Sequence, residues 1–106
     1  MRLSAETVHV IVDTFLSVFE KGELYLFGSR VDDTRKGGDI DLYIVADHRE
    51  MMGEKRIAFL TQLKQKIGEQ RIDLVIARGT HRPIDKIAIS EGLLLCQRHW
   101  SRYLIT

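Results

Sequence analysis

The chain has 106 residues, of which 44% are hydrophobic and 29% charged, a composition that excludes collagen-like, low-complexity and wholly disordered proteins. Its 16 basic and 15 acidic residues give a net charge of +1, without the basic excess typical of proteins held on nucleic acid mainly by phosphate contacts. We therefore expect one domain over residues 1–106, with no membrane span and no stable nucleic-acid binding.

The cysteine content and the first residues indicate the compartment. Cys96 is the one cysteine, so no internal disulfide can form, which favours a reducing environment. Glu6 and Asp13 interrupt the apolar residues near the start, which is untypical of a signal peptide. We expect a cytoplasmic protein, and the sequence leaves a homo-oligomer open.

The first half of the chain predicts a helix followed by two strands. From Ser4, a plausible N-cap, apolar residues recur at helical spacing up to Phe19, and Lys21-Gly22 supplies a cation and a glycine stop. Residues 23–27 form a short strand, and the polar, glycine-rich residues 28–38 a loop. Residues 39–46 are the clearest strand, with Ile40, Leu42 and Ile44 on one face and Asp39, Asp41, Tyr43 and Val45 on the other.

The second half predicts a helix, a strand and a last helix. Residues from about 50 to 69 predict a helix that ends near Gly68. On or beside one face of it, expected to be the apolar one, lie Ile57, Leu60, Leu63, Lys64 and Ile67. Residues 71–77 predict a strand, 78–83 a turn, and 84–97 a helix with Cys96 on its apolar face. The tail, residues 99–106, is unassigned; its apolar residues would cover the domain or meet a partner.

This order of elements predicts an α/β (or α+β) fold, a small mixed sheet with helices packed on it. The short connection between strands 23–27 and 39–46 favours antiparallel pairing. The helical crossover from 46 to 71 favours parallel pairing of the strands on either side of it.

Two aspartates on one strand face are the strongest chemical signal. Asp39 and Asp41 alternate with apolar residues, so both side chains lie on one side, roughly 6.5–7 Å apart along the backbone. Their charges repel, and a multivalent cation between them would relieve the repulsion; oxygen ligands suit Mg²⁺ or Mn²⁺. The structural alternatives are a turn-capping role for Asp39 and a salt bridge for Asp41.

A third acid, Asp73, interrupts the next apolar strand. If that strand lies beside 39–46, Asp73 faces the same site, and three convergent carboxylates suit two metal ions about 3.5–4 Å apart. Its alternative role is an ordinary ion pair with Arg71, two residues earlier on the same face.

Gly28 and Ser29 directly follow a predicted strand. A glycine there permits close approach of a ligand to the backbone, and the Ser29 hydroxyl could hold phosphate oxygens. Arg30 could contact the same phosphates, although a solvated arginine is its default role, and most Gly-Ser pairs after strands are only turns.

Together these residues carry a specific resemblance. A strand, Gly28-Ser29, a nine-residue gap, Asp39-Ile40-Asp41 and a later Asp73 resemble the DNA polymerase β-like nucleotidyltransferases over residues 1–98. At this length the chain is similar to a minimal nucleotidyltransferase, a group that includes antitoxins paired with HEPN-domain ribonuclease toxins.

The resemblance implies a palm-like domain with a defined set of roles. Gly28 and Ser29 would hold the triphosphate of ATP, Asp39 and Asp41 would bind Mg²⁺ or Mn²⁺, and Asp73 would complete the metal site and assist the attacking hydroxyl. AMP would pass to a tyrosine of a HEPN toxin, the partner encoded by the adjacent gene. The alternatives are an antitoxin that acts by binding alone and a nucleotidyltransferase for a small hydroxylated molecule.

Overall fold

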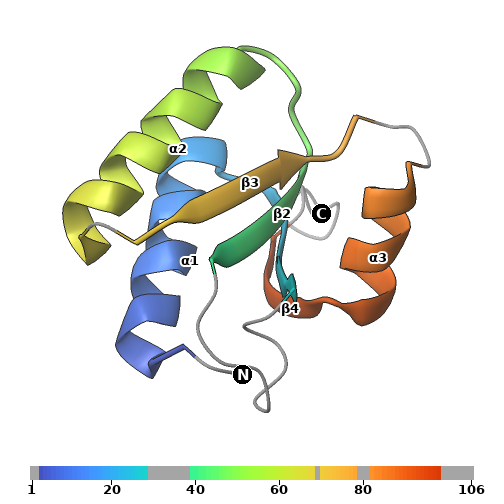
Figure 1. The fold of residues 1–106 in the computed structure, drawn as a ribbon. Helices are drawn as coiled ribbons and strands as arrows, with labels where there is room; N and C mark the ends of the chain where they lie inside the picture. Colours follow the sequence, from blue (N-terminus) through green and yellow to red (C-terminus); the bar gives the residue numbers. More distant parts are fainter. Residues whose placement is uncertain (1–2, 29–38, 69, 79–81, 99–106) are drawn as a thin grey trace, which may run out of the picture.

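The computed structural model describes residues 3–28, 39–68, 70–78 and 82–98. Along these residues (Figure 1) the elements are α1 (Ala5–Phe19), β1 (Gly22–Phe27), β2 (Ile40–Ala46), α2 (Met52–Ile67), β3 (Ile72–Ile76), α3 (Pro83–Glu91) and β4 (Leu93–Arg98). None of the helices described is both long and apolar enough to cross a membrane.

The strands form one mixed sheet in the order β3-β2-β1-β4. β1 and β2 are antiparallel, as their short connection predicted, and β2 and β3 are parallel, as the helical crossover predicted. β4 adds an antiparallel strand beside β1. The predicted mixed α/β architecture is confirmed.

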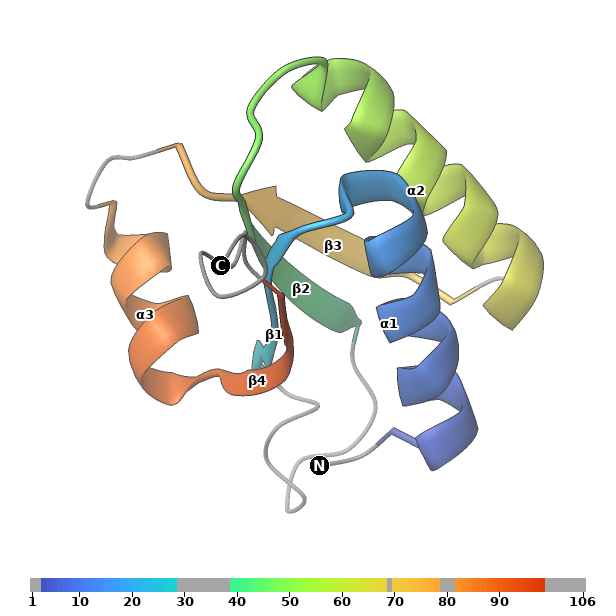
Figure 2. The same ribbon diagram turned by 180° about the vertical axis from the view of Figure 1, so that it is seen from behind.

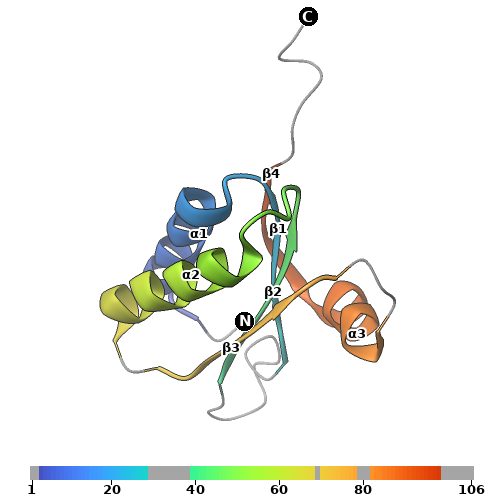
Figure 3. The same ribbon diagram turned by 90° about the horizontal axis from the view of Figure 1, so that it is seen from above.

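Helices α1 and α2 cover one face of the sheet (Figures 1 and 3). The main core lies between them and the sheet, and its side chains include Phe15, Phe19, Leu42, Phe59 and Leu63. The ring of Phe19 stacks on Phe15 and meets Phe59 edge-on, with centroids 5.7 and 5.8 Å away. Because these rings are fully buried, truncating Phe59 to alanine would cost about 3–5 kcal/mol.

Helix α3 lies on the opposite face of the sheet (Figures 2 and 3). A smaller apolar cluster forms there around Phe27, Tyr43 and Ala88. The predicted alternation of β2 is confirmed, because Ile40, Leu42 and Ile44 lie in the main core while Tyr43 lies in this second cluster. Asp41 therefore lies on the face of the sheet that carries α3.

The start of α1 is as predicted, whereas its end differs. The Ser4 side chain accepts a hydrogen bond from the Thr7 backbone N–H, which confirms Ser4 as the N-cap. The helix ends at Phe19, and Glu20 takes a positive φ of 67° while its N–H bonds the Leu16 carbonyl. Gly22 is not the helix stop, because it is already the first residue of β1.

The buried face of α2 was partly mispredicted. Leu63 is buried as expected, but Ile57 is 68% exposed and Phe59 is buried instead. Phe59 and Leu63 are four residues apart and share a face, whereas Ile57 and Phe59 differ by about 200° around a helix. The larger aromatic side chain therefore sets the rotation of α2 against the core. Its end at Gly68, with φ of 83°, was predicted correctly.

The predicted helix over 84–97 is wrong in its second half. α3 ends at Glu91, and residues Leu93–Arg98 form β4. Gly92 lies at the junction, where a Cβ atom would strike the Ala88 carbonyl oxygen, so the chain turns there at a residue without a side chain. Cys96 therefore lies on a strand, where it packs against the main core. The unassigned tail, 99–106, lies outside the described residues.

Candidate active site

The structure brings Asp41 and Asp73 together across two neighbouring strands. They occupy paired positions in the parallel register of β2 and β3, on the face that carries α3. Asp41 is half-buried and Asp73 is exposed. The prediction that Asp73 would lie beside the acids of β2 is thus correct for Asp41.

The electrostatics of this pair favour a bound cation. Burial, the charges of Asp73 and Asp39 and a hydrogen bond with Asp73, in this order, together raise the pKa of Asp41 from 3.8 to about 6. An acid whose charge is disfavoured by neighbouring acids gains from a positive ion among them.

Asp39 lies just before β2 and is held differently. Its Oδ2 is 3.6 Å from Nε of Arg71, and the two side chains are 34% and 80% exposed. Such an exposed ion pair contributes little to stability, about 0–1 kcal/mol. A cation that binds the Asp39 carboxylate more strongly would therefore displace Arg71. Arg71 therefore pairs with Asp39, whereas Asp73 forms no ion pair with a basic residue within the described part of the chain.

Gly28 forms the edge of the site next to Asp41. It follows β1 at the point where Phe27 pairs with Asp41, and its φ of 76° lies in the left-handed region. A Cβ atom at this position would overlap Oδ2 of Asp41. Glycine is thus required here by both the backbone conformation and the neighbouring carboxylate.

Ser29 and Arg30 lie outside the described residues, so their expected contacts with phosphate stay predictions. The glycine that precedes them is placed as expected, directly after a strand and beside the acids.

The donor set fits a magnesium-type ion. No group of three His, Cys, Asp or Glu side chains converges on a metal-sized point among the residues described. Mg²⁺ does not need one, because it is commonly held by one or two carboxylates together with phosphate oxygens of the substrate. Asp41 and Asp73 supply two carboxylates of this kind, and Asp39 stands close enough to influence Asp41 electrostatically.

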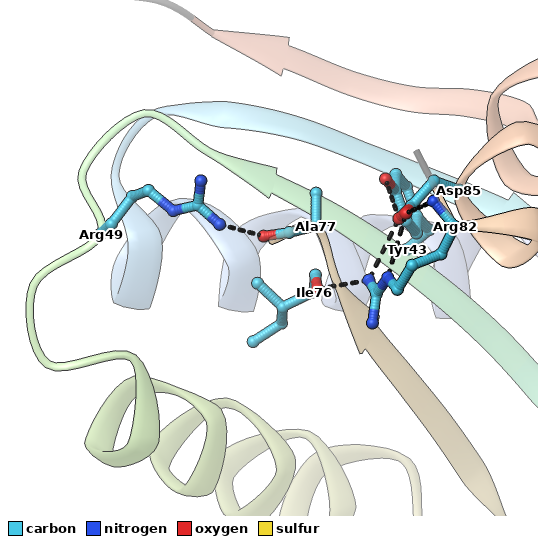
Figure 4. Close-up of polar contacts among 6 residues, drawn as sticks. All are labelled: Tyr43, Arg49, Ile76, Ala77, Arg82 and Asp85. Carbon is cyan, nitrogen blue, oxygen red and sulfur yellow. Dashed lines mark hydrogen bonds and ion pairs between the residues drawn. The ribbon is translucent and has the colours of Figure 1, made fainter. Parts of the chain in front are cut away.

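A buried network that the sequence did not reveal secures α3 next to the site (Figure 4). The Tyr43 hydroxyl donates to Oδ1 of Asp85 over 2.7 Å, and Arg82 donates to both oxygens of Asp85 and to the Ile76 carbonyl. Asp85 also accepts from the Arg82 backbone N–H, which caps the helix. Tyr43 is two residues from Asp41 on the same face, so this network fixes the strand that carries the site.

The network also shifts the pKa values of Asp85 and Tyr43. Hydrogen bonding from Arg82, then from Tyr43, holds the pKa of Asp85 well below its usual range. Burial, followed by the hydrogen bond to Asp85, raises the pKa of Tyr43 to about 12. Tyr43 therefore remains a neutral donor at physiological pH and plays a structural role.

Comparison with known proteins identifies the family. The chain belongs to the family described as Polymerase beta, Nucleotidyltransferase, whose model matches residues 11–100. This confirms the resemblance found in the Gly28-Ser29 and Asp39-Ile40-Asp41 motifs. No curated protein sequence matches this chain significantly.

Solved structures with the same fold come from toxin–antitoxin complexes. One is a tri-AMPylated Shewanella oneidensis HEPN toxin in complex with an MNT antitoxin, at 20% identity and a TM-score of 0.67, covering 87% of this chain and 71% of that chain. A toxin–antitoxin complex with AMP-PNP gives 21% identity and a TM-score of 0.71, covering 87% and 74%. A mutant MntA–HpeT toxin–antitoxin gives 19% and 0.70, with the same coverage of 87% and 74%. At these identities the likeness shows the fold.

Proposed function

We propose that this chain is a metal-dependent adenylyltransferase that transfers AMP from ATP to a hydroxyl, preferably of a tyrosine, on a HEPN-type toxin, and so acts as an antitoxin. The observation that carries the proposal is the contact geometry of three residues. Asp41 lies opposite Asp73 and against Gly28, in a chain of the nucleotidyltransferase family.

Each acid has a role in this proposal. Asp39, Asp41 and Asp73 hold Mg²⁺ or Mn²⁺, and Arg71 gives up its weak pair with Asp39 when the ion binds. The bound ion would neutralise phosphate charge and stabilise the charge that develops in the transition state. Gly28, together with Ser29 and Arg30, faces the triphosphate.

The transfer step balances without a further reactant. The acceptor oxygen forms a bond to the α-phosphorus of ATP, the bond from that phosphorus to the bridging oxygen breaks, and pyrophosphate leaves. Asp73 accepts the hydroxyl proton, since it is exposed and stands beside the acid that borders Gly28. The need for ATP is consistent with a cytoplasmic location.

An exposed apolar surface supports a protein acceptor. Four large apolar side chains on α3 and β4 are 40–54% exposed: Ile87, Ile89, Leu93 and Leu94. β4 is also an edge strand of the sheet. Exposed apolar side chains on and near an edge strand are typical of regions that meet another protein.

The same surface favours a second candidate function, neutralisation of the toxin by binding alone. In that case the acids would be dispensable and the apolar side chains of α3 and β4 would not. The charges of Asp39 and Asp73 contribute to the raised pKa of Asp41, so placing these acids together has an electrostatic cost. A catalytic metal site gives a reason for this cost, whereas binding alone does not.

An intact-mass experiment distinguishes the two functions. The adjacent gene product is mixed with this protein, ATP and Mg²⁺, and both masses are read. We expect one or more AMP additions on the partner, abolished by Asp41→Asn and retained by Asp13→Asn, which removes an exposed acid from α1. A stable complex in which the partner is inhibited but both masses are unchanged would show that the chain neutralises its partner by binding and not by catalysis. If neither a mass gain nor a complex is found, a small-molecule acceptor would be favoured.

A further inference from the structure

A basic hollow of about 390 Å³ lies at the other end of β3 from Asp73. The end of β3, the start of α2 and the residue before α3 line it. Four arginines line it: Arg49, Arg56, Arg78 and Arg82. Figure 4 shows two of them, Arg49 and Arg82, on either side of Ile76 and Ala77.

Two of the arginines are held in place by the protein itself. Arg49 donates to the Ala77 carbonyl over 2.6 Å, and Arg82 donates to the Ile76 carbonyl over 3.1 Å. The charge of Arg82 is offset by Asp85 at 3.0 Å, whereas the lining residues that the structure describes include no acid. Arg49 thus keeps a fixed position and most of its donors.

The other two arginines have unused donors. Arg56 and Arg78 are exposed, and neither has an ion pair or side-chain hydrogen bond among the described residues. Three guanidinium charges, from Arg49, Arg56 and Arg78, therefore line one hollow, and its described lining holds no acid to balance them. Like charges gathered at one hollow repel one another, and a bound anion would relieve this repulsion.

We propose that this hollow binds the phosphate group of a small phosphorylated molecule, at a site separate from the acids. One guanidinium group can donate hydrogen bonds to two oxygens of the same phosphate. A phosphate with two or more negative charges also balances the charge of three arginines better than a single carboxylate does. The lining also includes Leu74, Val75 and Ile76, and the volume is within the range of small-ligand sites. A diphosphate and a nucleoside monophosphate share this chemistry.

The start of α2 adds to the positive potential of the hollow. Met52 and Gly53 line the hollow, and Met51, the N-cap residue of this 16-residue helix, makes no capping hydrogen bond through its side chain. The first backbone N–H groups of the helix thus add to the positive potential that the arginines create.

The arginine-lined hollow and the acid site differ in whether they need a divalent cation to bind phosphate. Asp41 and Asp73 repel a phosphate unless a divalent cation is present, whereas the arginine-lined hollow attracts it directly. Binding in EDTA therefore reports on the hollow alone, and its outcome does not depend on whether the chain transfers AMP.

The test is calorimetric titration of the full chain with inorganic pyrophosphate and with AMP, in EDTA at low salt, with adenosine as the uncharged probe. We expect both phosphates to bind and adenosine not to bind. Arg56→Gln and Arg78→Gln should each weaken binding about tenfold, since one charge-assisted hydrogen bond contributes about 1.5 kcal/mol. Tighter binding of AMP than of pyrophosphate would identify a nucleotide as the ligand of the hollow. Tighter binding of pyrophosphate would identify an inorganic phosphate as that ligand.

Two controls separate this site from general attraction and from the acids. Arg98→Gln removes an exposed charge at the end of β4, on the far edge of the sheet, and should leave affinity within about twofold. Asp41→Asn should not weaken binding. Absence of binding by both phosphates, or equal loss of affinity in Arg56→Gln, Arg78→Gln and Arg98→Gln, would overturn the proposal.

Discussion

Gly28 and Asp41 are in direct contact, and the space for the Asp41 carboxylate exists because Gly28 has no side chain. The same glycine has a φ of 76°, which an L-residue with a Cβ adopts only with strain. Backbone conformation and carboxylate position are thus coupled at one residue.

Gly28→Ala is expected to displace Asp41 and to reduce AMP transfer at least tenfold. The added methyl group overlaps Oδ2 of Asp41, and the strained backbone would cost about 1–2 kcal/mol of stability. Transfer rates and thermal melts of the variant measure the two effects separately. Gly53→Ala is the matched control, since a Cβ there meets no atom within 4 Å, and it should keep wild-type activity with equal or higher stability, because alanine favours a helix more than glycine does. Equal activity of the two variants would contradict the proposed role of Gly28.

The affinity for Mg²⁺ should depend on pH in the range set by Asp41. With a pKa of about 6, Asp41 is largely ionised at pH 7 and above and largely protonated at pH 5. A protonated carboxyl must lose its proton before it binds metal, so affinity should fall by up to about tenfold per pH unit below 6. Titration with Mg²⁺ between about pH 5 and 8 tests this. A flat profile would show that Asp41 is not a ligand.

The repulsion among the acids should also lower the stability of the metal-free protein. The folded pKa of Asp41 lies above the unfolded value of 3.8, so its ionisation opposes folding. This penalty is absent below about pH 3.8, grows as the pH rises to about 6, and then stays constant.

Asp41→Asn should therefore stabilise the metal-free protein at pH 7 while abolishing transfer. The gain should reach about 1 kcal/mol after allowance for solvent screening, which raises the melting temperature by a few degrees. Thermal melts in EDTA measure it, and the difference should disappear near pH 3.5. Added Mg²⁺ should favour the wild type. A destabilised Asn variant at pH 7 would mean that Asp41 forms a favourable interaction in the metal-free state.

Local patterns in the sequence were sufficient to predict three of the four strands and the paired acids. β2 alternates strictly, so the face of Asp41 and Tyr43 followed from the sequence and is confirmed. β4 was missed because Leu93, Leu94 and Leu95 have no alternation and fit a helix equally well. The glycine before them was the signal, since it separates α3 from β4.

The residues that fix α3 could not be predicted from the sequence. Tyr43 and Asp85 are 42 positions apart, and only the folded chain brings them to 2.7 Å. The four arginines of the hollow come from the loop before α2, from α2 itself, from the segment after β3 and from the N-cap of α3. No local pattern links such positions, because their proximity depends on how α2 and α3 dock on the sheet.

Tyr43→Phe should loosen α3 without changing the chemistry of the acids. The substitution removes the hydroxyl that donates to Asp85, so a buried carboxylate loses one of its partners, at a cost of about 1–2 kcal/mol in the free energy of unfolding. Tyr25→Phe is the control, since its hydroxyl contacts Glu23 in a less buried place, and it should cost less. Denaturant unfolding measures both, and hydrogen exchange should show faster opening of α3 in Tyr43→Phe alone. Unchanged stability of Tyr43→Phe would mean that Arg82 satisfies Asp85 without the tyrosine, and α3 would then be secured by the apolar cluster around Ala88.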